Sequence, residues 1–75
     1  MQQRIEINPV VCHGKPVVRG TRVPVSVVLG ALSGGDTIDQ VLEDYPTLCR
    51  DDIHAVLDYA GQLSRFEEHA YELAV

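Results

Sequence analysis

The sequence predicts one small, mainly α-helical domain with a three-helix core and a short β element at its N-terminus. Three observations lead to this prediction. Apolar residues recur at helical spacing in three separate segments, turn-forming residues separate these segments, and a short alternating stretch precedes them. At 75 residues the chain has room for one domain, and no apolar run approaches the ~20 residues of a membrane span. We therefore expect a globular protein that does not enter a membrane.

The β element is predicted from two short extended segments. Residues 5–7 alternate apolar and charged side chains before an Asn-Pro turn, and residues 16–18 form a second extended piece that ends at Gly20. Two such strands are only marginally stable alone, so we expect them to pair with a helix or with another chain. A homodimer would supply the other chain. Its contacts are predicted at the four apolar strand residues Ile5, Ile7, Val17 and Val18.

The first two helices are each marked by an apolar stripe and by clear ends. Pro24 suits the first turn of a helix, and two glycines at residues 34–35 end the stripe that follows it. Thr37 and Gln40 match a capping box, in which each side chain binds a free backbone N–H of the helix start. Pro46 prevents the second helix from continuing. The two stripes consist of Val25, Val28, Leu29 and Leu32, and of Ile38, Val41, Leu42 and Tyr45.

A third and longer helix is predicted to begin near Arg50. Its stripe consists of Ile53, Val56, Leu57, Ala60 and Leu63. Gly61 weakens this helix by roughly 1 kcal/mol relative to alanine, but apolar residues keep helical spacing beyond the glycine. We divide the chain into a three-helix domain over residues 1–63 and a C-terminal helical arm over residues 64–75, which we expect to fold fully only against a partner.

The net charge of −5 hides an asymmetry between the two halves of the chain. Residues 1–35 hold four basic residues and one acidic residue, whereas residues 36–75 hold ten acidic and two basic residues. Because phosphate binding depends on lysine and arginine, only the first half suits nucleic acid. The acidic half suits a basic protein partner instead.

The sequence favours a protein without catalytic, metal or cofactor chemistry. Cys12 and His13 are adjacent, but the sequence lacks the paired ligands two to four residues apart that zinc ribbons and fingers use. Free cysteines are also common as small core residues. The N-terminus carries no secretory signal, so we expect a cytoplasmic protein in which Cys12 and Cys49 are both reduced. We therefore expect no enzyme activity, no bound metal and no cofactor.

One pattern is specific enough to suggest a family. Residues 14–25 are GKPVVRGTRVPV, followed by DYP at residues 44–46, DI at residues 52–53 and YA at residues 59–60. This pattern resembles the family of domain of unknown function 433 over roughly residues 5–61. The resemblance implies a helix-turn-helix core of homeodomain-like or winged-helix-like type. It also implies an antitoxin-like protein that partners a PIN-type ribonuclease toxin, in the manner of VapB and VapC.

The chain departs from the family pattern where the third helix begins. Cys49 stands where the family usually has Thr or Ser as a helix cap. Because a thiol is a weak hydrogen-bond acceptor, this helix start should lose up to ~1 kcal/mol of capping. We therefore expect the start of the third helix to fray.

The third helix would be the DNA-reading helix of a helix-turn-helix, with its N-terminal residues at the base edges. Arg50 is the basic residue at this place, and acidic residues outnumber it. Such a surface is a poor reader of the major groove. The alternative is that the acidic residues favour the helix N-terminus through its dipole and are otherwise solvated. They are Asp51, Asp52 and Asp58, and His54 lies among them.

Lys15, Arg19 and Arg22 are better candidates for phosphate contacts than the third helix. They lie within eight residues of one another, and a dimer would present them twice. The alternative is structural, because an arginine beside glycine and threonine often braces a turn by bonding to a carboxylate. Asp44 or Asp52 is a suitable carboxylate. We keep both interpretations for Arg19 and Arg22 and expect Lys15 to be exposed.

The arm carries the predicted contacts to a toxin. Phe66, Tyr71 and Leu73 lie among three glutamates, which suits an amphipathic helix that docks into the basic groove of a ribonuclease. The alternatives are that the arm packs on its own dimer or stays disordered. We predict a non-catalytic, homodimeric antitoxin that binds a PIN-type toxin and operator DNA. The other hypotheses are a DNA-binding regulator without a toxin, and a dimerisation or interaction domain only.

Overall fold

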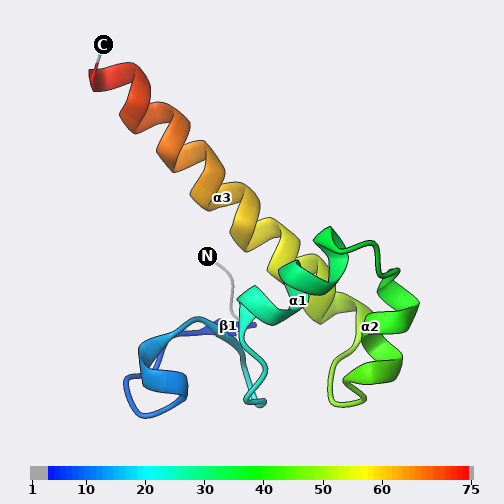
Figure 1. The fold of residues 1–75 in the computed structure, drawn as a ribbon. Coiled ribbons are helices and arrows are strands. Elements are labelled where there is room, and N and C mark those ends of the chain that lie inside the picture. The colour runs from blue at the N-terminus through cyan, green and yellow to red at the C-terminus, as the bar shows by residue number, and fades with distance from the viewer. Residues whose placement is uncertain (1–3, 75) are drawn as a thin grey trace.

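The computed structural model describes residues 4–74 and confirms a mainly helical chain with three helices and a short two-stranded sheet (Figure 1). The elements follow in the order β1 (Ile5–Glu6), the 3₁₀ turn η1 (Cys12–Gly14), β2 (Val17–Val18), α1 (Val25–Ser33), α2 (Ile38–Asp44) and α3 (Arg50–Ala74). Both α1 and α2 pack on the N-terminal half of α3 (Figure 1). The other half of α3 projects away from them.

The two strands form an antiparallel pair that closes onto the core of the same chain. Ile5 lies opposite Val18 and Glu6 lies opposite Val17. Val17 also forms an isolated bridge with Pro24, just before α1. Strand β1 contacts α3, so a helix of the same chain supplies the cover that two short strands need.

The core is formed where the three helices and the sheet meet. Its largest fully buried side chains are those of Val17, Val18, Val28, Val41, Ile53 and Val56. The set includes residues from β2 and from every helix, so each predicted stripe contributes to one continuous core. Small aliphatic side chains, most of them valine, dominate this core.

The predicted capping box at the start of α2 is present. The backbone N–H of Gln40 donates to Thr37 Oγ1 at 3.2 Å, and the backbone N–H of Thr37 donates to Gln40 Oε1 at 2.8 Å. The helix ends at Asp44, before Pro46. Helix α1 begins after Pro24, which is its N-cap residue and forms no side-chain capping bond.

Helix α3 is continuous across Gly61 and across the predicted boundary at residues 63–64. The predicted stripe is only partly buried. Leu57 is 44 % exposed and Leu63 is 49 % exposed, so the expectation that both belong to the core was wrong. Neither leucine belongs to the core cluster or to the partly buried residues that pack against it. Within residues 4–74, none of the helices combines the length and apolar character needed to span a membrane.

Candidate interaction surfaces

The segment between β2 and α1 is a tight turn held by backbone and hydroxyl hydrogen bonds. The backbone N–H of Val18 donates to the carbonyl of Val23 at 3.0 Å. Thr21 Oγ1 donates to the Val18 carbonyl at 2.7 Å and accepts from the N–H of Val23 at 3.0 Å. Gly20 has a φ of +81°, which favours glycine. The RGTR part of the family motif therefore builds a fixed turn.

Three basic residues of the first half lie exposed around this turn. Arg19 and Arg22 lie within it and Lys15 lies just before β2, and we call the three together the basic turn. Arg50 belongs to another surface, because it lies at the start of α3 and its guanidinium binds the carboxylate of Asp39 in α2. The structure thus places two of the four predicted DNA contacts in this turn, Lys15 before β2, and Arg50 at the α2–α3 junction.

The start of α3 is held by a second cluster that joins it to the beginning of β1. Asp52 accepts a hydrogen bond from the backbone N–H of Cys49 at 3.0 Å and from Arg4 Nη1 at 2.9 Å. The Cys49 thiol also donates to Asp52 Oδ2 at 3.4 Å. The Arg4 guanidinium reaches Asp51 as well, with 3.6 Å between Nη2 and Oδ2.

The position of Asp52 changes the expectation for the helix cap. Cys49 offers no hydroxyl acceptor, but Asp52 is the third residue of α3 and binds the backbone N–H of Cys49 from within the helix. This is the reciprocal half of a capping box. This hydrogen bond stabilises the helix start that we expected to fray. We had not predicted it, because we considered Asp52 only as a solvated acid or as a partner of Arg19 and Arg22.

Burial by itself raises the pKa of Asp52, because a desolvated carboxylate is less stable in its charged form. The hydrogen bonds from the backbone of Cys49, from Arg4 and from the Cys49 thiol favour the charged form and outweigh burial. The pKa of Asp52 therefore lies below its ordinary value. Asp52 is 8 % exposed, and folding favours the negatively charged form of its carboxylate.

The exposed surface at the N-terminal end of α3 is mixed and largely acidic. Asp51, His54 and Asp58 are exposed there beside Arg50. With the Arg50 guanidinium bound to a carboxylate, this surface offers little positive charge to phosphate. The surface therefore has the acidic character expected from its residue types.

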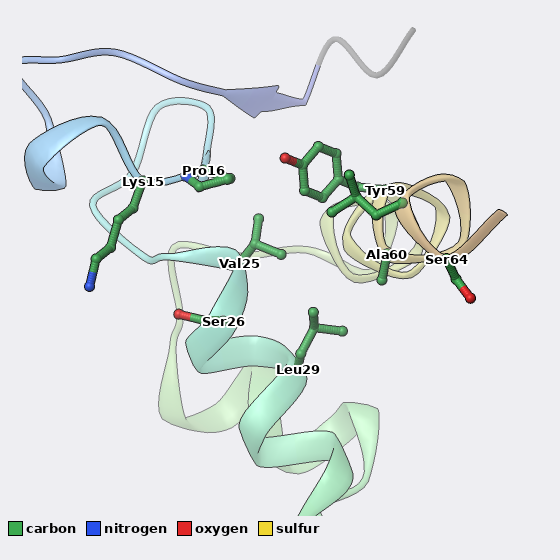
Figure 2. A pocket seen from close by; sticks show the side chains of 9 residues that line it. Lys15, Pro16, Val25, Ser26, Leu29, Tyr59, Ala60 and Ser64 are labelled. Atoms are coloured by element: carbon green, nitrogen blue, oxygen red, sulfur yellow. The ribbon is translucent and has the colours of Figure 1, made fainter. Parts of the chain in front are cut away.

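An apolar groove runs between α1 and α3 (Figure 2). Its walls come from Val25 and Leu29 of α1 and from Tyr59, Ala60 and Leu63 of α3, with Ser26 and Ser64 at its margins. Pro16 lies at one end, and Lys15 extends outward at the rim (Figure 2). The groove has a volume of about 520 Å³ and is open to solvent. Sequence reasoning missed it, because the stripe that forms one wall was assigned to the core.

Most of the predicted dimer residues pack inside the single chain and are not available to a second copy. Ile5, Val17 and Val18 are buried in its own core, whereas Ile7 is 62 % exposed. A dimer through this element would therefore have to use Ile7 and the strand backbone. The predicted toxin contacts Phe66, Tyr71 and Leu73 belong to α3, but their side chains lie outside the described part of the structure.

The described residues contain no cluster of three or more histidine, cysteine, aspartate or glutamate side chains placed to hold a metal ion. Cys49 is an exposed free thiol. The features that the fold does bring together are the basic turn, the cluster at the start of α3 and the apolar groove. Two of these are exposed surfaces suited to binding another molecule.

Comparison with known proteins agrees with the motif. The chain resembles a DUF433 member protein from Anabaena variabilis in its crystal structure, with 32 % identity and a TM-score of 0.77; the match covers 99 % of this chain and 71 % of that one. It is also 40 % identical over 53 residues to the protein y4eO of Sinorhizobium fredii, covering 71 % of this chain but 24 % of y4eO. The family model for proteins of unknown function DUF433 matches residues 5–60, and the chain therefore belongs to the DUF433 family.

Proposed function

We propose that this chain is a non-catalytic, antitoxin-like protein that uses the C-terminal half of α3 to bind a PIN-type ribonuclease toxin in the cytoplasm. The observation that carries this proposal is the length of α3. The helix has 25 residues. The last α3 residue that lines the groove with α1 is Ser64, so ten residues of α3 follow the groove. The remainder projects past every other described element (Figure 1).

A projecting helix of this kind favours a partner. Isolated helices shorter than about 12–15 residues are marginal in water, so the stretch beyond Ser64 gains stability from packing against something else. The sequence of that stretch is amphipathic and acidic, with Phe66, Tyr71 and Leu73 among three glutamates. A ribonuclease needs a positive cleft for RNA, and an acidic helix that covers such a cleft would inhibit it.

The proposal is tested by co-expressing the full chain with a PIN-like protein from the neighbouring gene. We expect the two proteins to co-purify and the ribonuclease activity to be suppressed. Failure of the purified pair to associate at micromolar concentration would overturn the proposal.

Substitutions in α3 test whether its C-terminal half is the part that contacts the toxin. The triple substitution Phe66→Ala, Tyr71→Ala and Leu73→Ala should weaken the complex at least ~100-fold, since interface aromatic residues often dominate binding energy. Leu57→Ala is the matched control, because Leu57 is an exposed apolar residue on the same helix but near its other end. Equal loss of binding in both variants would count against the arm as the toxin site.

A second candidate function is DNA binding, and the basic turn is the observation that favours it. In this proposal α2 and α3 form a helix-turn-helix-like pair, but the phosphate contacts come from Lys15, Arg19 and Arg22 rather than from the start of α3. All three side chains are exposed, with Arg19 and Arg22 in the turn after β2 and Lys15 just before this strand. The acidic surface around Arg50 would face away from the phosphates, because like charges repel.

A further inference from the structure

The apolar groove lies along the same helix whose C-terminal part projects beyond the core. Tyr59 and Leu63 line the groove, and α3 continues from them without a break to Ala74. Leu63 is 49 % exposed at the point where the groove opens onto the projecting stretch. A ligand that covers both parts has to be elongated and apolar along one side, as an amphipathic helix is.

The sequence of α3 carries the spacing of a coiled-coil seam along this surface. Apolar residues occur in alternating steps of four and three, at Tyr59, Leu63, Phe66, Ala70 and Leu73. Their mean spacing of 3.5 residues keeps the five positions on one face of a continuous helix. Tyr59 and Leu63 of this seam line the groove, and the same spacing continues in the sequence to residue 73.

We infer that this groove receives α3 of a second copy of the chain, packed antiparallel to its own α3. The four seam positions from Tyr59 to Ala70 are complementary to themselves in that orientation. With the two-fold axis between residues 64 and 65, Leu63 of one copy lies opposite position 66 of the other, and Tyr59 lies opposite position 70. A two-fold interface requires this reciprocity, because the same patch has to meet itself.

Shape and reach both favour the antiparallel pair over a parallel one. Antiparallel pairing sets the large ring of Tyr59 against the small Ala70, whereas parallel pairing would set tyrosine against tyrosine and alanine against alanine. The ten residues after Ser64 span about 15 Å as a helix, which carries them along the groove wall of the other copy past Tyr59. Each groove is then filled by the partner's helix.

Charge points to the same orientation. The projecting stretch holds three glutamates and one arginine, so parallel helices would bring two acidic stretches side by side. Antiparallel helices separate the two stretches and bring each one to the basic half of the other copy. Lys15 lies at the rim of the groove there, exposed to an arriving acidic helix.

This inference goes beyond the proposed function, since it concerns the chain without any toxin, in which the stretch of α3 proposed to bind the toxin pairs with a second copy. It is tested on the purified chain alone. Sedimentation velocity should show a dimer for the wild type. Leu63→Glu should raise the dimer dissociation constant at least ~100-fold, because each dimer loses two buried leucines and gains two buried charges. Leu57→Glu, the matched exposed leucine outside the groove, should leave the dimer intact.

The register is tested by disulfide trapping in a background with Cys12→Ser and Cys49→Ser. Tyr59→Cys mixed with Ala70→Cys should give a disulfide-linked heterodimer on oxidation, while neither variant should link efficiently to itself. Efficient self-linking of Tyr59→Cys would indicate parallel helices and overturn the antiparallel pair. A wild-type monomer at 100-micromolar concentration, or equal dissociation by Leu57→Glu and Leu63→Glu, would overturn the groove as the dimer site.

Discussion

Arg4 and Asp52 lie 48 positions apart in the sequence, yet 2.9 Å separates Arg4 Nη1 from Asp52 Oδ1. This contact joins the residue just before β1 to the first turn of α3. Asp52 binds the backbone N–H of Cys49 with its other carboxylate oxygen. One side chain therefore caps the longest helix and ties the N-terminal segment to it.

The stability of the protein should fall with acidification through the protonation of Asp52. The pKa of Asp52 is lowered by folding, so its contribution is fully present above the ordinary value of about 4 and is lost as the pH falls through the lower folded value. Asp52→Asn should cost about 1 kcal/mol at pH 7. Urea unfolding across pH 2–7 should show the difference from wild type shrinking toward pH 2. A difference that stays constant with pH would contradict a charged Asp52 in the fold.

The capping box of α2 makes a measurable contribution to stability. Thr37→Ala removes the acceptor of the Gln40 N–H and should lower the free energy of unfolding by about 1 kcal/mol. Thr47→Ala is the matched control, because Thr47 is an exposed threonine in the turn between α2 and α3. Thermal unfolding followed by circular dichroism compares them, and equal effects would contradict the capping role.

Two glycine-to-alanine substitutions should change stability in opposite directions. Gly20 has a φ of +81°, so Gly20→Ala should destabilise the turn by about 1–2 kcal/mol although space is open around it. Gly30 lies within α1, also with open space around it, so Gly30→Ala should stabilise the protein by about 0.5–1 kcal/mol. Chemical denaturation measures both. A neutral Gly20→Ala would mean that the turn tolerates another backbone conformation.

DNA binding through the basic turn predicts a strong dependence on salt. Affinity for the DNA upstream of the gene should fall steeply between 50 and 200 mM salt, as about three phosphate contacts per copy release counterions. The triple variant Lys15→Ala, Arg19→Ala and Arg22→Ala should lose binding and remain folded. Fluorescence anisotropy measures the affinity and circular dichroism the fold. Affinity that is independent of salt, or unchanged in the triple variant, would exclude this surface as the DNA contact.

Much of the fold was predictable because its signals are local. The Thr37–Gln40 capping box spans four residues, and the sequence alone predicts both hydrogen bonds that the structure contains. The helical stripes likewise identify which residues share a face. A stripe does not show how far along a helix that face is covered, and for this reason the exposure of Leu63 was not predictable.

The interaction surfaces depended on contacts between distant segments. Nothing near Arg4 in the sequence indicates Asp52 as its partner, since the contact exists only once β1 packs beside α3. The groove depends in the same way on where α1 crosses α3.

The sequence by itself determined the family, the three helices, their caps and the separation of basic from acidic residues, because motifs, helical period and capping act within a few positions of the chain. Only the tertiary structure decided which apolar residues are buried and which are left at the surface. Ile5, Val17 and Val18 are buried in the core, whereas Leu63 is half exposed in the wall of the groove. The physical reason is that burial depends on what packs against a face, and that neighbour comes from a distant part of the chain.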